Sequence, residues 1–179
     1  MKALEKICLL SILIFFMLIG TNTLQGKAFA GAENSKAPDF SLKDINGKDF
    51  TLSSLKGKVV ILSFWATWCH PCKDEMPKLN KLYKEMRSMG LEIVAVSSDY
   101  SIGSLKDFIV KNSLDFSILY DEKRTVTRQY KIPYLPVTFL IDKNGVIVEK
   151  ITGEFEWPSG EMKKKLEKLL QQTYPPSGV

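Results

Sequence analysis

Two of the three cysteines in this chain, Cys69 and Cys72, lie three positions apart where an apolar run gives way to a helical pattern. The run KVVILSFWA, residues 58–66, is continuous, β-branched and aromatic, as is typical of a strand buried on both faces. The apolar residues that follow have helical spacing: Met76, Leu79, Leu82 or Tyr83, and Met86. Gly90 is suited to end that helix. The two thiols are therefore predicted at the start of a helix that follows a buried strand.

The rest of the chain alternates between strand and helix patterns. Residues 39–58 hold two short alternating runs around Asn46-Gly47, which predicts a β-hairpin. Further strands are expected within 91–98, 115–121 and 136–152, the last being two strands around an Asn144-Gly145 turn, and further helices within 104–112, 123–132 and 159–173. This order predicts the α/β class, in which helices cover both faces of a central sheet with parallel pairs.

The N-terminus has the composition of a targeting segment. Lys2 and Lys6 precede an apolar stretch of 14 residues, 7–20, which is shorter than the roughly 20 residues needed to span a bilayer. Ala28-Phe29-Ala30 then matches an A-x-A cleavage pattern. Residues 1–30 are therefore predicted to be a signal peptide, with an uncleaved membrane anchor or a buried core helix as the alternatives.

The remaining 149 of the 179 residues suit a single domain. Residues 31–37 are expected to form a linker, residues 38–173 the domain and residues 174–179 a flexible tail. Without residues 1–30 the formal charge falls from +5 to +3, because three lysines and one glutamate are lost. With no Arg-rich stripe and no basic patch interleaved with aromatic residues, this charge gives no support for nucleic-acid binding.

Export would leave Cys69 and Cys72 as the only thiols, since Cys8 lies within the predicted signal peptide. It would place them in an oxidising compartment, in the periplasm or at the outer face of the cytoplasmic membrane. A disulfide between them closes a very short loop and restricts the unfolded chain little. The pair is therefore predicted to serve chemistry rather than stability.

The predicted helix start gives the two thiols different roles. Free amide groups and the helix macrodipole favour negative charge there, so the pKa of the Cys69 thiol is expected to be lowered and Cys69 to be the nucleophile. Cys72, one turn further on, can displace whatever Cys69 has captured. Pro71 suits a first helical turn because it lacks an N–H. A zinc site is disfavoured, because the pair is accompanied by a single histidine, His70.

The segment VVILSFWATWCHPCKDEMP, residues 59–77, resembles the active-site segment of the thioredoxin superfamily. Residues 37–69 resemble more narrowly the exported thiol-disulfide oxidoreductases of the ResA, TlpA and CcmG type, with a domain of the AhpC/TSA-Redoxin kind. The resemblance covers about residues 38–172. It implies a thioredoxin-like fold whose central mixed β-sheet is flanked by helices, with an N-terminal β-hairpin and a β-α insertion at about residues 98–120.

The resemblance also assigns residues to the substrate site. Pro136 matches the family's cis-proline beside the active site, although proline is also common at the start of an edge strand. The backbone of Leu135 would then pair with an extended substrate segment. Trp68 and Tyr134 would border that groove, whereas Trp65 is expected to pack in the core, as is Trp157.

Proton handling departs from that of cytoplasmic thioredoxin. Its buried aspartate is Ser63 here, and the lysine that faces it aligns with Ala95. Glu75 matches an acidic residue that the exported subgroup places close to its cysteines. At i+3 from Cys72 it is expected to accept the proton of that thiol, with a solvated helix acid as the alternative.

The dipeptide between the cysteines is His70-Pro71 rather than Gly-Pro. A protonated His70 beside Cys69 would stabilise the thiolate, so both dipeptide residues are candidates for tuning its pKa. A decrease of one unit corresponds to about 1.4 kcal/mol, or about 30 mV. A solvent-facing His70 with little effect is the alternative.

The resemblance implies an extracytoplasmic, monomeric reductase of protein disulfides that needs no cofactor or metal. It implies apocytochrome c, during cytochrome c maturation, as one substrate, and a CcdA- or DsbD-like membrane thiol donor as the partner that recharges the protein.

Three other functions are alternatives to a reductase of protein disulfides. A disulfide oxidant or isomerase often carries histidine at the second dipeptide position, where Pro71 stands. A peroxiredoxin-like thiol peroxidase needs a Thr-x-x-Cys site preceded by proline, which Thr67-Trp68-Cys69 does not supply. A copper chaperone would use Cys-x-x-x-Cys with a distant histidine, and the chain has neither.

Overall fold

The computed structural model describes residues 33–173, so the predicted signal peptide and the predicted tail lie outside the described residues. The elements, in order, are β1 (Ser41–Lys43), β2 (Asp49–Thr51), η1 (Leu52–Leu55), β3 (Val59–Trp65), α2 (His70–Met86), η2 (Arg87–Met89), β4 (Leu91–Ser97), α3 (Ile102–Asn112), β5 (Ser117–Tyr120), α4 (Thr125–Gln129), β6 (Val137–Ile141), β7 (Ile147–Thr152) and α5 (Gly160–Gln171). None of the helices within 33–173 is long and apolar enough to cross a membrane.

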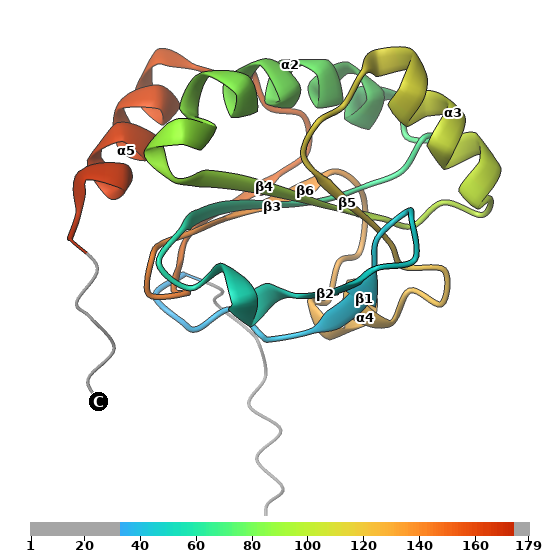
Figure 1. The fold of residues 1–179 in the computed structure, drawn as a ribbon, viewed down its shortest axis with the longest axis horizontal. Helices are drawn as coiled ribbons and strands as arrows, with labels where there is room; N and C mark the ends of the chain where they lie inside the picture. Colours follow the sequence, from blue (N-terminus) through green and yellow to red (C-terminus); the bar gives the residue numbers. More distant parts are fainter. Residues whose placement is uncertain (1–32, 174–179) are drawn as a thin grey trace, which may run out of the picture.

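Five strands form one mixed sheet in the order β5-β4-β3-β6-β7 (Figure 1). β3 runs parallel to β4, and β4 to β5, whereas β6 is antiparallel to both β3 and β7. All residues of the central strand, β3, are buried. The mixed sheet that the resemblance implies is confirmed, and its central strand is the one that leads to Cys69.

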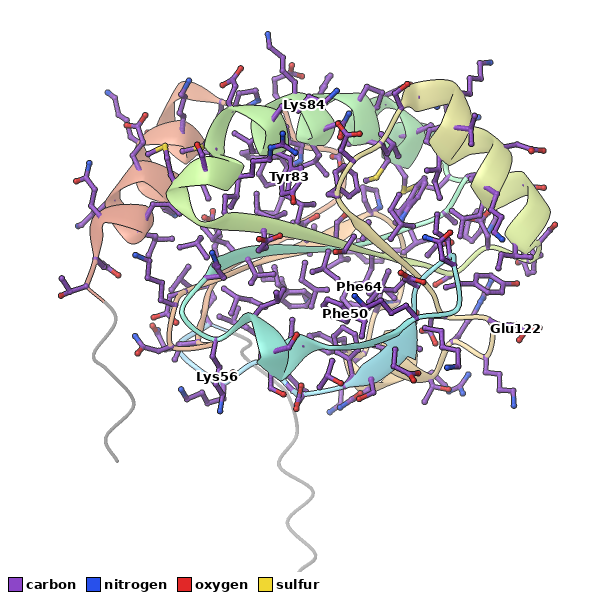
Figure 2. The ribbon with its side chains drawn as sticks, viewed as in Figure 1. Phe50, Lys56, Phe64, Tyr83, Lys84 and Glu122 are labelled. Atoms are coloured by element: carbon purple, nitrogen blue, oxygen red, sulfur yellow. A yellow bond between two sulfur atoms is a disulfide. The ribbon has the colours of Figure 1, made fainter. Side chains whose placement is uncertain are left out.

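The sheet separates two layers and two hydrophobic clusters. α2, α3 and α5 lie on one face, and the β1–β2 hairpin and α4 lie on the other (Figure 1). Tyr83 lies on the α2 side of the sheet, whereas Phe64 and Phe50 lie on the hairpin side (Figure 2). Successive residues of β3, such as Ile61 and Leu62, enter different clusters because side chains alternate along a strand.

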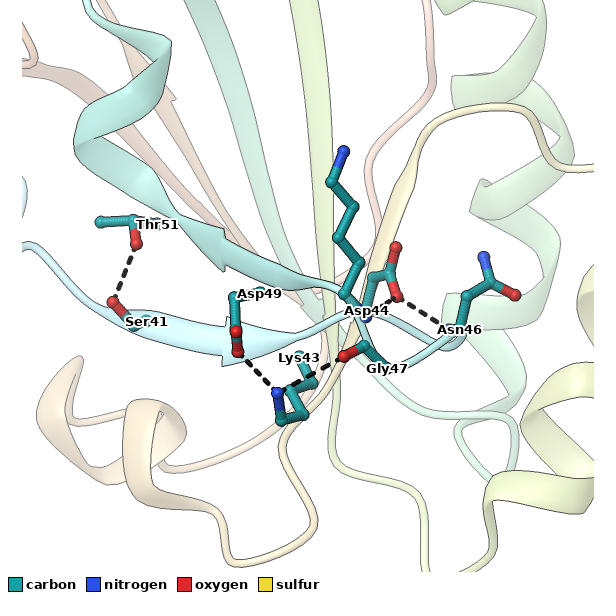
Figure 3. A network of polar contacts seen from close by, with 8 residues as sticks. Ser41, Lys43, Asp44, Asn46, Gly47, Asp49 and Thr51 are labelled. Carbon is teal, nitrogen blue, oxygen red and sulfur yellow. Dashed lines mark hydrogen bonds and ion pairs between the residues drawn. The ribbon is translucent and has the colours of Figure 1, made fainter.

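The predicted hairpin is present as β1 and β2, which pair antiparallel. Gly47 in its turn has φ +85°, which glycine adopts without strain. A carboxylate oxygen of Asp44 accepts the N–H groups of Asn46 at 2.8 Å and Lys48 at 2.9 Å, which closes the turn. Side-chain contacts between the two strands complete the hairpin (Figure 3).

The predicted helices are present, with some ends shifted. α2 ends at Met86 and is continued by the 3-10 turn η2, after which Gly90 adopts a left-handed conformation with φ +102°. α5 buries the apolar residues expected of it: Met162, Leu166, Leu169 and Leu170. The predicted insertion at 98–120 contains α3 and β5, and β5 extends the sheet beyond β4.

The segment before Pro38 is hydrogen-bonded to the domain. Asn34 donates its N–H to the carbonyl of Ile147 at 2.8 Å, and Ile147 donates its own N–H to the Ser35 carbonyl at 2.9 Å. Ala37 donates its N–H to the Gly145 carbonyl at 2.9 Å. Residues 34–37, which fall in the expected linker, therefore run beside the start of β7.

Candidate active site

Cys69 is the N-cap residue of α2, after a short turn that leaves β3 at Trp65. Its Sγ accepts the backbone N–H of Cys72 at 3.3 Å. Pro71 stands in the first turn, where its missing N–H breaks no helical hydrogen bond, and His70 is exposed as the first helical residue. The predicted placement of the cysteine pair at a helix start is confirmed.

Cys69 and Cys72 form a disulfide, with their Cα atoms 5.3 Å apart. The two sulfurs differ in their access to solvent, because Cys69 is 7% exposed and Cys72 is 0% exposed. Cys69 also lines a surface groove. A substrate that approaches the protein therefore meets Cys69 first.

Glu75 lies on the buried face of α2, one turn after Cys72, and is 1% exposed. One of its carboxylate oxygens accepts the backbone N–H of Phe155, from the loop between β7 and α5. Burial is the main influence on the pKa of this carboxyl, which is raised from 4.5 to about 7. The hydrogen bond from Phe155 and the positive charge of Lys78 lower the pKa, whereas the negative charge of Glu154 raises it further. The alternative of a solvated helix acid is wrong, because the side chain is buried.

The groove beside Cys69 has a volume of about 470 Å³. Its lining residues are Trp68, Cys69, Pro71, Ser98, Arg124, Thr127, Ile132, Pro133, Tyr134 and Leu135. Trp68 and Tyr134 are 51% and 56% exposed, so both can contact a partner. The Leu135–Pro136 peptide bond is cis, as the resemblance implies, and Pro136 itself is buried. The structure thus brings three of the predicted substrate-site residues to one groove, with Pro136 adjoining it.

Two residues near this groove were not identified from the sequence. Tyr100, which is 80% exposed, stacks on Trp68 with ring centroids 5.9 Å apart and planes 28° apart. The guanidinium carbon of Arg124 lies 5.1 Å from the centroid of the Tyr100 ring. Both residues lie outside regular elements, one after β4 and one before α4, so no periodic pattern marks them.

Asp99 was also missed, although it holds the turn before Cys69 in place. Its buried carboxylate accepts the N–H of Thr67 at 3.1 Å, the Oγ1–H of Thr67 at 2.5 Å and the Oγ–H of Ser97 at 2.7 Å. A signal was available, because β4 is parallel to β3 and residues that follow parallel strands meet at one sheet edge. The polar residues directly after β4 therefore had to lie near the thiol pair.

Two positions at which cytoplasmic thioredoxin has a buried aspartate and a facing lysine hold no ionisable group here, because they are Ser63 and Ala95. Ser63 pairs in register with Ala95 on one side and with Thr138 on the other. The Oγ1–H of Thr138 donates to the Ser63 Oγ at 3.2 Å, so this buried hydroxyl pair is satisfied. Glu75 is consequently the ionisable side chain on the buried face of α2 besides the cysteines.

Trp65 and Trp157 are buried, as expected for packing residues. Neither indole N–H meets hydrogen-bond geometry with a partner within 33–173. The Trp157 N–H nevertheless lowers the pKa of Glu75 slightly, as the smallest of the influences on it. Within the same residues, no group of three or more His, Cys, Asp or Glu side chains is arranged to hold a metal ion.

Comparison with known proteins agrees with this site. Residues 34–150 match the AhpC/TSA family. The thiol-disulfide oxidoreductase ResA of Bacillus cereus (strain ZK / E33L) is 39% identical over 168 residues, which cover 92% of this chain and 93% of the relative. ResA of Bacillus subtilis (strain 168) is 43% identical over 135 residues, which cover 73% and 75% of the two chains. A crystal structure described as a candidate DsbE-type thiol:disulfide interchange protein, from Chlorobium tepidum, matches with a TM-score of 0.72 at 31% identity, covering 77% of this chain and 97% of its own.

The family match spans more than half of the chain, and these relatives are matched over most of their own length. The matched region includes the buried strand β3, the helix-capping Cys69 and the buried Cys72. The thioredoxin-like fold expected from the sequence is thereby confirmed, with its five-stranded sheet and separate N-terminal hairpin. The chain belongs to the AhpC/TSA family, and it is a thiol-disulfide oxidoreductase similar to the ResA proteins.

Proposed function

We propose that this protein reduces disulfides in other proteins outside the cytoplasm. The observation that carries the proposal is the order of groups along the start of α2. Cys69 caps the helix and faces a groove, Cys72 is sealed behind it, and Glu75 is buried one turn further on with a pKa of about 7. This order supports a mechanism in which an accessible nucleophile, an internal second thiol and a proton acceptor act in turn.

In the first step, the thiolate of reduced Cys69 attacks one sulfur of a substrate disulfide. The substrate S–S bond breaks, a mixed disulfide forms, and the second substrate sulfur leaves as a thiolate that takes a proton from water. The N–H of Cys72, which points at the Cys69 sulfur, stabilises negative charge on it before the attack.

In the second step, Cys72 gives its proton to the Glu75 carboxylate and attacks the Cys69 sulfur. The mixed disulfide breaks, the substrate leaves with both of its sulfurs reduced, and the protein is left with the Cys69–Cys72 disulfide present in this structure. A carboxyl with a pKa of about 7 can both accept and return a proton near neutral pH, which suits this role.

Substrate binding in this proposal uses the backbone beside the cis-proline. Leu135 lines the groove directly before β6, so an extended segment can align with its backbone next to Cys69. Trp68 and Tyr134 supply exposed aromatic area on which such a segment packs. His70 and Pro71 are proposed to tune the reactivity of the Cys69 sulfur.

The cellular setting is proposed from the sequence. The signal peptide predicted at residues 1–30 would export the protein, and a CcdA- or DsbD-like membrane thiol donor would return its disulfide to the dithiol. Apocytochrome c is the proposed substrate, and the protein is proposed to act as a monomer. The names of the relatives state only thiol-disulfide oxidoreductase activity, which supports the chemistry.

The test is the equilibrium potential of the Cys69–Cys72 couple against glutathione, combined with alkylation trapping of its state in the cell. A mostly reduced pair with a potential near or below about −220 mV supports a reductase. A mostly oxidised pair with a potential near about −120 mV would show a disulfide oxidant instead.

A further inference from the structure

Arg124 is the side chain that brings a formal charge to the groove beside Cys69. It is partly buried and stands directly before α4, with φ +52°. Its Nη2 is buried and has no hydrogen-bond partner among residues 33–173. Arg124 also forms no ion pair with a carboxylate among residues 33–173, so its positive charge is not paired within this part of the chain.

The carboxylates of Asp121 and Asp99 accept hydrogen bonds from groups other than the Arg124 guanidinium. The carboxylate of Asp121 accepts the N–H of Thr125 at 2.8 Å, and the N–H and Oγ1–H of Thr127 at 2.8 and 2.7 Å, so it is occupied in capping α4. Asp99 is occupied by hydrogen bonds from the β3–α2 turn. Neither carboxylate forms an ion pair with Arg124.

The guanidinium is also held in position. It lies over the ring of Tyr100, which in turn stacks on Trp68, the residue before Cys69. The planar N–H groups of a guanidinium match the two oxygens of a carboxylate. The row Arg124–Tyr100–Trp68 thus holds a cationic group in the groove that Cys69 also lines.

We infer that the groove selects substrate segments that carry an aspartate or glutamate close to the attacked cysteine, and that Arg124 binds this carboxylate. The inference rests on the proposed function, since the ligand is part of the protein whose disulfide is reduced. Apart from the Cys69 thiolate of the reduced protein, the remaining lining residues are neutral and largely apolar, so Arg124 is the group by which the groove distinguishes a substrate carboxylate.

The first experiment varies the substrate and leaves the protein intact. Synthetic peptides with one intramolecular disulfide carry Glu, Gln or Lys in turn at each of the three positions on either side of the cysteines. The reduced full chain is expected to reduce the best Glu peptide with a kcat/KM roughly tenfold or more above its Gln counterpart, and to reduce the Lys peptide least. The advantage of Glu is expected in KM and to shrink as salt is added.

The second experiment varies the protein. R124Q is expected to remove the preference for Glu over Gln, measured as the ratio of kcat/KM for the two peptides within each protein, and R124K to restore only part of that ratio. R128Q, which removes the same charge from an exposed position on α4, is the matched control and should keep the full preference.

Three results would overturn the inference, and they are distinguishable from one another. Equal kcat/KM for the Glu, Gln and Lys peptides at every position in the wild-type protein would show that the groove does not recognise a carboxylate, although disulfide reduction itself stands. Reduction of none of the peptides would refute the proposed function, and the inference with it. A preference for Glu that survives R124Q would likewise assign recognition to another group.

Discussion

At Cys69 the helix start supplies a stabilising contact for a sulfur anion. The N–H of Cys72 lies 3.3 Å from the Cys69 Sγ, and no helical carbonyl competes for it in the first turn. In reduced protein the rate of alkylation should therefore have a pH midpoint below about 7.5, against about 8.5 for an ordinary thiol. In a chain of residues 33–173, which lacks Cys8, the C69S variant is the control, because its remaining thiol, Cys72, is 0% exposed and should react far more slowly. A midpoint at 8.5 would contradict the helix-start argument.

Glu75 makes the free energy of unfolding fall as pH rises, which is the reverse of the usual effect of a carboxyl group. The folded protein holds the proton of this carboxyl up to about pH 7, whereas the unfolded chain loses it near 4.5. The unfolded state therefore binds fewer protons in that window, and the free energy of unfolding falls as pH rises through it. The penalty is absent below pH 4 and reaches up to about 3 kcal/mol above pH 7.

E75Q should remove that penalty, because glutamine keeps the acceptor for the Phe155 N–H and cannot ionise. Urea unfolding of the oxidised proteins should show E75Q more stable than wild type at pH 8 and equal to it at pH 4. D74N, at the exposed neighbouring position, should follow the wild-type pH dependence. Parallel curves for E75Q and wild type would show that the carboxyl does not titrate in this range.

The sequence predicted the positions and roles of these side chains to different extents, for a physical reason. Cys69 at a helix start followed from local spacing, since one strand pattern and one helix pattern meet there. The burial of Glu75 depends on Phe155, which is 80 positions away in a loop without periodicity, so i+3 spacing alone left both roles open. The unpaired nitrogen of Arg124 likewise arises only once α4, β4 and the active-site turn are assembled.

At the scale of elements, Asp99 joins the end of β4 to the turn between β3 and α2. D99A would leave the N–H and hydroxyl of Thr67 unpaired, which costs roughly 1–3 kcal/mol of stability. Because Thr67 is followed by Trp68, the groove wall should loosen, raising KM for a disulfide peptide more than it lowers kcat. Thermal unfolding and steady-state kinetics check both effects, with D107A, at an exposed position on α3, as control. Unchanged KM in D99A would show that this contact does not position the groove.

Element types were predictable here because each core element has a strong apolar pattern, either periodic or continuous. α5 shows its inward face in the spacing of Met162, Leu166 and Leu169, and β3 is a continuous apolar run. Ends were less predictable, as η2 shows, because the last turn of α2 tightens only where Gly90 redirects the chain. The backbone pairing of residues 34–37 left no pattern, since it uses main-chain groups that every residue carries.

For the whole molecule, that pairing decides where the stable unit begins. Residues 34–37 make three backbone hydrogen bonds beside the start of β7, and Ala37 packs against the hairpin-side cluster. A chain of residues 38–173 should therefore unfold at a Tm several degrees below that of residues 33–173, a loss of roughly 1–3 kcal/mol.

The rate of disulfide exchange of the shorter chain should be unchanged. Val60 pairs with Ile141, and Phe64 with Val137, so the 145–147 turn lies at the end of the sheet away from Cys69. Calorimetry and peptide reduction on the two truncations separate the effects. Equal Tm values would place the domain start at Pro38, and slower exchange in the shorter chain would show that the sheet edge and the thiol site are coupled.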